Sequence, residues 1–466
     1  MAQTGNKEPE TKQPEKKLIN LLRGWPSPHL LPSEILRRAA DKVLSDPAVF
    51  VPALQYGPDP GYEPLREALA VWLSAAYGVK PDVRELCITG GASQNIACVL
   101  QSYTDPVYTL AVWAVTPCYF LACPIFEDAG FGERLRGLPE DEEEVDVEFL
   151  ERALQECEEK EGREEKPYKH PTPHRKLYRH IIYLVPTCAN PSGKTLPLAR
   201  RTALVHLARR HNALIIADDV YDLLQWPTTT TTTPSSSQAE IPPLPRLSDI
   251  DIPLGPSPHD PPARHFGHAV SNGSFSKLLG PGVRTGWAHG TPDFAYGLAQ
   301  TGSTRSGGAP SQLTAAIVTQ VVVDGGLDGH LRERVRPALQ ARHTRVVEAV
   351  KRELGWAGVR VVESSEGGRG VFGGYFVWVT LPEGGPTAAE VAERARAEEL
   401  IVAPGGMFEV GMGDGGRFER NLRLCFSWEE EEVVVEGVER LGTVLRRWYQ
   451  GTVAVGEKWE NAEGHK

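Results

Sequence analysis

Apolar residues along this chain occur in two patterns, and each pattern predicts a different kind of element. Residues 63–77 and 198–211 repeat apolar side chains at helical spacing, which predicts two helices. Short continuous apolar runs at residues 86–89, 180–186 and 213–217 predict strands that are buried on both faces. Strands of this kind that alternate with helices indicate a parallel sheet with helices on both of its faces.

A second α/β pattern begins near residue 311 and continues with helical spacing to about residue 354. Three strand candidates follow it, at residues 359–362, 375–379 and 422–426. The two patterns predict two domains. The boundaries that we expect are 51–310 for a large domain, and 18–50 together with 311–450 for a smaller α+β domain.

Four segments differ in composition from these domains. Residues 1–17 predict a disordered polar tail, and residues 451–466 form a C-terminal tail. Residues 140–176 are highly charged and predict an inserted, solvated helix face and loop. Residues 227–262 contain a run of threonines with many serines and prolines, so we expect a mobile insertion that buries little apolar surface.

Composition and charge exclude several classes of protein. The 466 residues carry a net charge of -11, which argues against nucleic acid as a partner. Apolar residues make up 41%, and no run is long enough to predict a membrane span or a secretion signal. The 7 cysteines lack CxxC spacing, which predicts reduced thiols and neither a disulfide framework nor a metal site. We therefore expect a soluble cytoplasmic enzyme.

The segment 274–287 carries the most informative chemistry. Lys277 follows Ser274 and Ser276, and Arg284 comes seven residues after Lys277 in a glycine-rich stretch. A lysine in this position can form a Schiff base with pyridoxal phosphate, and the hydroxyls and guanidinium can hold the phosphate. A solvated lysine in a glycine-rich loop is the alternative interpretation of the same motif.

A second phosphate signal stands between a predicted strand and a predicted helix, at residues 90–94. The N–H groups and the dipole at a helix N-terminus favour a bound phosphate. This signal is weak by itself, because two consecutive glycines often make only a tight turn. Combined with the residues around Lys277, it predicts that Gly91, Ala92 and Ser93 take part in binding the cofactor.

Pyridoxal phosphate also needs a carboxylate near its ring nitrogen. Asp218 closes a predicted apolar strand, where a carboxylate is costly unless it is paired. Asp219 competes with it, but strand alternation directs only one of the two inward, and we favour Asp218. Tyr221 and Asn190 are candidate donors to the phenolic oxygen of the ring, although an ordinary turn also explains Asn190. Tyr119 either stacks on the ring or belongs to the core.

Seven segments, in order and spacing, resemble the fold-type I pyridoxal-phosphate enzymes of the class I/II aminotransferase family, from about residue 19 to about residue 449. The similarity is strongest to the branch of 2-aminoadipate and kynurenine aminotransferases. It implies a large domain with a mostly parallel, seven-stranded sheet between helices, and a smaller α+β domain. The matching segments are Leu54–Gly57 with Gly61, Pro64–Arg66, Thr89–Gln94, Asn190–Gly193, Asp218–Tyr221, Ser274–Trp287 and Asn421–Leu424.

The resemblance also implies roles for individual residues. Arg423 matches the arginine that binds the α-carboxylate of the substrate, and Gly24 matches a glycine whose backbone meets the same carboxylate. Trp25 and Tyr119 match residues that line the substrate pocket, where Asn190 also binds. Tyr56 matches a tyrosine that reaches the phosphate in a neighbouring subunit, which implies a homodimer.

Two departures from the family leave the substrate open. Relatives of the aminoadipate type often bind the distal carboxylate of the substrate with an arginine of an N-terminal helix. Residues 1–17 contain no arginine, and Arg23 is the nearest candidate. Ala92 stands where relatives often have a serine.

The reaction that the resemblance implies is a ping-pong transamination, with Lys277, Asp218 and Tyr221 as catalytic residues and a 2-oxo acid such as 2-oxoglutarate as acceptor. A β-lyase or a β/γ-replacement enzyme would use the same residues, and only the need for an acceptor distinguishes them. A transcription regulator with an aminotransferase-like sensor is the third interpretation. The resemblance begins near residue 19, so we expect no room for the DNA-binding domain of such a regulator.

Overall fold

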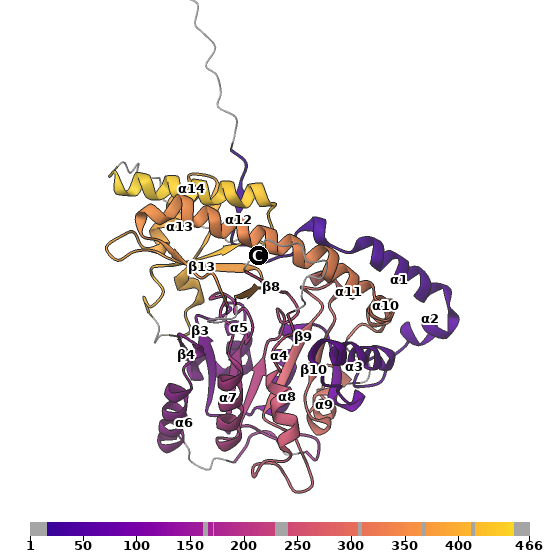
Figure 1. Cartoon of the computed structure of the whole chain (residues 1–466). Helices are drawn as coiled ribbons and strands as arrows, with labels where there is room; N and C mark the ends of the chain where they lie inside the picture. The colour runs from indigo at the N-terminus through magenta and orange to yellow at the C-terminus, as the bar shows by residue number, and fades with distance from the viewer. Residues whose placement is uncertain are drawn as a thin grey trace, which may run out of the picture.

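The largest element of the structure is a mixed sheet that helices cover on both faces (Figure 1). The computed structural model describes residues 16–161, 166–170, 172–228, 241–305, 310–365, 370–411 and 415–451. Within them this sheet has eight strands, in the order β2-β10-β9-β7-β6-β3-β4-β5. Neighbours from β9 to β4 pair in parallel, whereas β2–β10, β10–β9 and β4–β5 pair antiparallel. The strands are β2 (Leu86–Thr89), β3 (Ala111–Thr116), β4 (Leu135–Asp141), β5 (Glu144–Val145), β6 (His180–Leu184), β7 (Ala213–Ala217), β9 (Ala269–Ser274) and β10 (Gly286–His289).

Alternate side chains of the buried strands pack against two different groups of helices. In β6, Ile181 and Tyr183 join the apolar cluster of α4, α5 and α9, while Ile182 and Leu184 join that of α6, α7 and α8. Successive residues of a strand point to opposite faces, so these two groups form the outer layers. The helices are α4 (Ala92–Tyr103), α5 (Cys123–Phe126), α6 (Val147–Glu161), α7 (Leu198–Arg210), α8 (Leu247–Asp251) and α9 (Pro292–Ala299).

A four-stranded antiparallel sheet, in the order β11-β13-β16-β15, lies with α12, α13 and α14 at the top of Figure 1. Two short pairs join distant parts of the chain, β1 with β14 and β8 with β12. The elements are β1 (Ile19–Asn20), β8 (Gln225–Pro227), β11 (Arg360–Val361), β12 (Val371–Gly373), β13 (Phe376–Thr380), β14 (Leu400–Ile401), β15 (Ala403–Pro404), β16 (Asn421–Cys425), α12 (Arg336–Leu354), α13 (Ala388–Arg396) and α14 (Glu431–Tyr449).

Five further helices share one continuous apolar cluster with the four-stranded sheet and α14. Because this cluster includes side chains from α1 as well as from α14, the two ends of the described chain are packed into a common core. These helices are α1 (Ser33–Ser45), α2 (Pro47–Ala53), α3 (Glu63–Tyr77), α10 (Gln312–Val323) and α11 (Gly326–His330).

The elements predicted from apolar spacing agree with the structure, but the strand count differs by one. The predicted helix over 63–77 coincides with α3, and the three predicted buried strands correspond to β2, β6 and β7. The large sheet has eight strands and not the expected seven, because Glu144 and Val145 turn back to pair with the end of β4. A two-residue strand inside an acidic run gives no apolar pattern to detect.

The charged segment 140–176 contains the predicted solvated helix face, in α6, but it also contains buried charges. Glu140 belongs to β4, and Glu144 in β5 is fully buried. Lys176 is 4% exposed and lies inside the protein. The helix α6 buries an apolar face against β3, β6 and α7, so its many charges occupy only the opposite face.

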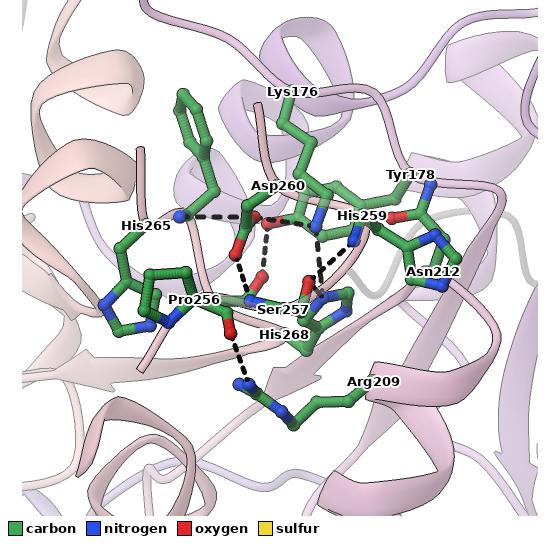
Figure 2. A network of polar contacts seen from close by, with 12 residues as sticks. Lys176, Tyr178, Arg209, Asn212, Pro256, Ser257, His259, Asp260, His265 and His268 are labelled. Atoms are coloured by element: carbon green, nitrogen blue, oxygen red, sulfur yellow. Dashed lines mark hydrogen bonds and ion pairs between the residues drawn. The ribbon is translucent and has the colours of Figure 1, made fainter. Parts of the chain in front are cut away.

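The second half of the segment 227–262, for which we expect a mobile insertion, contains a helix and buried polar contacts. Residues 229–240, with most of the threonine run, lie outside the described residues. Residues 241–262 include α8 and a buried network of polar contacts (Figure 2). In this network Lys176 Nζ donates to Asp260 Oδ1 at 2.9 Å and lies 3.0 Å from His268 Nε2. Ser257 N donates to the other oxygen of Asp260 at 2.8 Å. Polar pairing thus anchors a segment that has few apolar residues.

The described residues contain no helix that is long and apolar enough to cross a membrane. The same residues contain no group of three or more His, Cys, Asp and Glu side chains placed to hold a metal ion. None of the seven cysteines forms a disulfide bond.

Candidate active site

The carboxyl ends of β7 and β9 bring Asp218 and Lys277 to the same edge of the large sheet. The two strands are parallel neighbours, so the residues that follow them lie close together. Asp218 comes directly after β7, and Lys277 comes shortly after β9. The charge of each residue shifts the pKa of the other, as expected for groups in the same site.

Asp218 is 5% exposed and is held by side chains of neighbouring strands. Tyr183 Oη donates to Asp218 Oδ2 at 3.0 Å, and Asn272 Nδ2 donates to Oδ1 at 3.3 Å. Asn95 Nδ2 donates to Asn272 Oδ1 at 2.8 Å, which fixes the orientation of that amide. Burial raises the pKa of Asp218 to about 7, and the Tyr183 hydrogen bond and the charge of Lys277 oppose the rise. A cation bound beside Asp218 would restore its carboxylate form.

Asp219 is buried as well, but it belongs to different surroundings. Burial and then the neighbouring Asp222 raise the pKa of Asp219. Asp222 in turn accepts a hydrogen bond from Tyr77 Oη at 2.9 Å. This difference favours Asp218 over Asp219 as the aspartate that faces Lys277.

The amine of Lys277 has a single hydrogen-bond acceptor among the described residues. Its Nζ donates to Gly24 O at 2.9 Å and lies 4.9 Å from the centre of the Tyr375 ring. Burial lowers the pKa of Lys277 to about 8, the charge of Arg423 lowers it further, and Asp218 opposes the change. The neutral amine, which is the form that acts as nucleophile or base, is therefore accessible near neutral pH.

The predicted phosphate-binding residues come together at the start of α4. Gly91 precedes this helix with a φ of 102°, and no side chain caps the helix. A Cβ at Gly91 would lie 2.6 Å from Arg284 Nη2, so glycine is needed for the guanidinium to approach. Arg284 Nη2 donates to Gly90 O at 2.7 Å. Ser274 Oγ donates to Ser276 Oγ at 3.0 Å in the same region.

The donors of this region are suited to a dianion. The N–H groups of Ala92 and Ser93 open the helix and have no partner within it. Arg284 Nη1 lies 3.4 Å from Ser276 Oγ, so a guanidinium and a hydroxyl adjoin these N–H groups. Ala92 offers no hydroxyl, but its N–H remains, and the helix dipole favours a phosphate at this point.

Arg423 of β16 is a buried cation, 2% exposed. Its Nη1 donates to Asn190 Oδ1 at 2.8 Å, and its Nη2 donates to Leu22 O at 2.6 Å. The guanidinium lies 4.0 Å from the centre of the Phe376 ring, and burial lowers the pKa of Arg423 to about 10. No carboxylate of the described residues pairs with it, and its Nε has no hydrogen-bond partner there. A buried guanidinium in this state favours an anionic ligand.

Two tyrosines of the predicted site lie near these charges. Burial raises the pKa of Tyr119 to about 12, with the charge of Asp218 adding to the rise and that of Arg423 opposing it. Tyr221 is 3% exposed, and its ring centroid is 5.5 Å from that of Tyr375. Burial raises the pKa of Tyr221 well above its usual value. Both phenols are therefore neutral at physiological pH and can donate hydrogen bonds.

Two predicted residues lie outside this buried group. Tyr56 is 85% exposed on the surface of the single chain. Trp25 is 47% exposed and packs edge-on against Trp428, with ring centroids 5.7 Å apart. Gly24, next to Trp25, belongs to the site through its carbonyl and packs on Phe376, whose ring would collide with any side chain at that position.

Sequence reasoning missed the residues that hold the site together. Tyr183 and Asn272 hold Asp218, Asn95 holds Asn272, and Leu22 O accepts from Arg423. A polar residue inside a fully buried strand was the available signal for Asn272. No local pattern marks Leu22, because its contribution is a backbone carbonyl.

Pyridoxal phosphate fits these groups. Lys277 supplies an amine for its aldehyde, and Asp218 supplies a buried carboxylate for its ring nitrogen. The start of α4 and Arg284 supply hydrogen-bond donors for its phosphate. The uncapped helix start and the unpaired Nε of Arg423 each leave room for an anion, which the phosphate and the substrate carboxylate provide.

Comparisons with known proteins agree with this arrangement. Residues 17–441 match the family model of aminotransferase class I and II. The Saccharomyces cerevisiae protein YER152C is 33% identical, over 92% of this chain and 97% of its own length. The crystal structure of kynurenine aminotransferase from Pyrococcus horikoshii has a TM-score of 0.73 and 26% identity, and covers 93% of this chain and 91% of that one.

A second solved structure bears directly on the cofactor. The α-aminoadipate aminotransferase of Thermus thermophilus, complexed with N-(5'-phosphopyridoxyl)-L-leucine, has a TM-score of 0.70 and 28% identity. The match covers 93% of this chain and 93% of that chain. The present chain therefore belongs to the class I and II aminotransferase family, has the fold-type I architecture, and transfers amino groups with pyridoxal phosphate as its cofactor.

Proposed function

We propose that this enzyme moves the amino group of an L-amino acid with a 2-aminoadipate-like or aromatic side chain to a 2-oxo acid such as 2-oxoglutarate, by a ping-pong mechanism. One observation carries the proposal: carbonyls of two nearby residues, Leu22 and Gly24, bind Arg423 and Lys277 respectively. An α-carboxylate anchor and a reactive amine are therefore adjacent, as the two ends of an α-amino acid require.

When bound, pyridoxal phosphate supplies an aldehyde that exchanges amino groups and a ring that withdraws electrons from the substrate Cα. Lys277 would hold this aldehyde through its amine, and the same amine would serve as the base when it is free. With its pKa lowered to about 8 by burial, the free amine of Lys277 would accept the proton from the substrate Cα and hold it for return.

Asp218 stabilises a positive charge on the ring nitrogen. Its carboxyl group has a pKa of about 7 in these surroundings because of burial, and a cationic partner favours the ionised form. Tyr183 and Asn272 keep the carboxylate in place through hydrogen bonds of 3.0 and 3.3 Å. Tyr221 would donate a hydrogen bond to the phenolic oxygen of the ring.

Arg423 binds the α-carboxylate of the substrate through a charge-assisted, two-point contact. Its present hydrogen bonds to Asn190 and Leu22 O already fix the plane of the guanidinium. The unpaired Nε gives it a further donor for the incoming carboxylate. This contact orients the Cα–H bond towards Lys277.

The active form that we propose is a homodimer. Tyr56 is 85% exposed in the single chain, and Leu54 beside it is 58% exposed, so both are free to meet a second copy. In the dimer, Tyr56 of one subunit contributes its hydroxyl to the phosphate region of the other.

The test is a half-reaction with the purified, pyridoxal-phosphate-loaded enzyme. It is mixed with single amino acids, starting with 2-aminoadipate, and the absorbance of the cofactor is followed without an acceptor. We expect loss of the starting band, with formation of pyridoxamine phosphate and the matching 2-oxo acid. Release of ammonia or a thiol with regeneration of pyridoxal phosphate would instead establish lyase or replacement chemistry.

A further inference from the structure

The side-chain amide of Asn190 has one end bound and the other end available. Its Oδ1 accepts from Arg423 Nη1 at 2.8 Å. A guanidinium has donors only, so the oxygen of this amide must face Arg423, and Nδ2 points the other way. Asn190 is 7% exposed, and within the described residues its Nδ2 donates no hydrogen bond. The orientation of Asn190 therefore decides whether its N–H groups can reach a ligand.

Side chains of the loop that carries Asn190 reach the end of β4. Ser192 Oγ donates to Glu140 Oε1 at 2.8 Å, and Lys194 Nζ lies 3.2 Å from Glu140 Oε2. Lys194 Nζ also donates to Asp141 O at 2.7 Å. The two oxygens of a single carboxylate thus hold two residues that follow Asn190 in the loop.

The backbone of this loop carries the anchoring back to Asn190. Gly193 N donates to Ala189 O at 2.7 Å, and Ala189 N donates to Lys194 O at 2.8 Å. These two bonds close residues 189–194 into a turn that contains Asn190. A shift of Ser192 or Lys194 therefore also shifts Asn190.

Glu140 itself belongs to a rigid part of the large sheet. Its strand, β4, pairs with β3 on one side and with β5 on the other. Because β4 and β6 both pair with β3 in parallel, their carboxyl ends lie at the same edge of the sheet. Glu140 near the end of β4 and Asn190 behind β6 line one small cavity, together with Tyr119 and Tyr183.

Glu144 provides an internal comparison. It comes four residues after Glu140, is fully buried and lines the same cavity. Within the described residues neither of its carboxyl oxygens has a hydrogen-bond partner. Burial, and then the charge of Glu140, raise the pKa of Glu144 well above its usual value, so this carboxyl group is neutral. Of two buried glutamates in one cavity, only Glu140 holds the loop of Asn190.

We propose that Glu140 is a positioning residue, which fixes the turn 189–194 through Ser192 and Lys194 and so directs the Asn190 amide towards the phenolic oxygen of the cofactor ring. The destination of the amide rests on the proposed function, whereas the anchoring of the turn does not. Glu140 acts through these partners and touches neither substrate nor cofactor.

The first test is hydrogen exchange of the holoenzyme, followed by mass spectrometry of peptides that contain residues 189–194. Glu140→Gln keeps the shape of the side chain, but an amide has one oxygen and no charge, so it cannot bind Ser192 and Lys194 as the carboxylate does. We expect the exchange of the turn to become about 10-fold faster or more. Glu144→Gln replaces a neutral acid by a neutral amide in the same cavity and should leave this exchange within about twofold.

The second test is a pH titration of the absorbance of the bound cofactor, which a purely structural role of Glu140 would not move. A donor to the phenolic oxygen stabilises its anionic form, so a misplaced donor raises the pH of the transition. We expect a rise of about 0.5–1 pH unit in Glu140→Gln and none in Glu144→Gln. Ser192→Ala removes one of the two contacts and should give a smaller rise, which also serves if Glu140→Gln folds poorly.

Asn190→Ala separates this proposal from the proposed function. If Asn190→Ala raises the midpoint while Glu140→Gln and Ser192→Ala leave it unchanged, Glu140 does not position the amide and the proposal is overturned. Equal exchange of the turn in Glu140→Gln and Glu144→Gln would overturn it as well. If Asn190→Ala itself leaves the midpoint unchanged, the role of Asn190 in the proposed function fails, and the exchange rates still decide whether Glu140 fixes the turn.

Discussion

The parallel strands β7 and β9 have a lysine and an aspartate side chain near each end, and the two pairs differ in their polar partners. At the amino ends Lys176 forms a 2.9 Å ion pair with Asp260 (Figure 2). At the carboxyl ends Lys277 and Asp218 form no ion pair with each other within the described residues, and Lys277 Nζ donates to a backbone carbonyl.

The pKa values distinguish the two aspartates from each other, but they do not distinguish the two lysines. Burial lowers the pKa of Lys176 and of Lys277 alike, to about 8. Burial raises the pKa of Asp218 to about 7. The pKa of Asp260 is lowered although burial opposes this, because Lys176 and Ser257 N stabilise its charge. A lowered lysine pKa is therefore a poor mark of a catalytic lysine. A nearby buried carboxylate that accepts hydrogen bonds but has no ion-pair partner among the described residues is a better one.

The largest expected difference between the two ends is in turnover. Lys277→Ala should retain the fold and lower kcat for transamination by at least about 10⁴-fold, because no other residue can supply the reactive amine. Steady-state kinetics and the thermal unfolding midpoint measure the two properties. Substantial turnover by this variant would remove Lys277 from the proposed mechanism.

Lys176→Met should give the opposite result. It leaves the carboxylate of Asp260 buried without its partner, so we expect a loss of about 3–5 kcal/mol in the free energy of unfolding. Turnover per folded molecule should stay within about twofold, since the network lies at the other end of β7. Urea unfolding measures the loss, and adding Asp260→Asn as a second substitution should restore part of it. A small loss, or a selective loss of turnover, would contradict the comparison.

Asp218→Asn should lower turnover by about 100-fold or more and stabilise the cofactor-free protein. Because burial raises the folded-state pKa of Asp218 to about 7 from 3.8, the folded protein binds more protons than the unfolded chain between about pH 4 and pH 7. Its stability therefore falls as the pH rises through this window. The variant does not lose stability in this window. The difference in unfolding free energy between the variant and the wild type should therefore grow from pH 5 to pH 8, to on the order of 2–4 kcal/mol. Urea unfolding at both pH values checks it, and a constant difference would refute it.

The smallest expected effect comes from single hydroxyl groups. Ser257→Ala removes a 2.8 Å contact with His268 Nε2 and should cost about 1 kcal/mol of unfolding free energy with no change in turnover. Ser276→Ala is the matched change at the other end and should weaken retention of pyridoxal phosphate, measured by dialysis. If both variants changed cofactor retention equally, the two ends would not be independent.

How well the sequence predicted the place of a residue depended on the kind of residue. Asp218 and the glycines before α4 come directly after apolar strands, and Lys277 comes shortly after β9, so the order of strands and polar residues indicated a common edge of the sheet. Arg423 and Gly24 were found only through resemblance to a family. The buried state of Glu144 and Lys176 was not predictable, because a charged stretch gives the same pattern whether its charges are paired inside or solvated outside.

The polar network of Figure 2 shows the same limit for the threonine-rich region. Composition indicated mobility for residues up to 262, yet Asp260 accepts a hydrogen bond from Lys176, 84 positions earlier, and Ser257 Oγ contacts His268, directly before β9. Long-range polar pairing has no local signature, so only the three-dimensional structure reveals it.

The contacts of Arg423 with Leu22 O and of Ser427 with Trp25 O join residues 401 and 402 positions apart. A ribosome releases Lys277, Asp218 and the start of α4 long before it releases Arg423. Under the proposed mechanism, a nascent chain therefore contains the groups that would hold the cofactor before it contains the proposed anchor for the amino acid. Incomplete chains that end before β16 lack that anchor, so substrate selection is acquired only with the last part of synthesis.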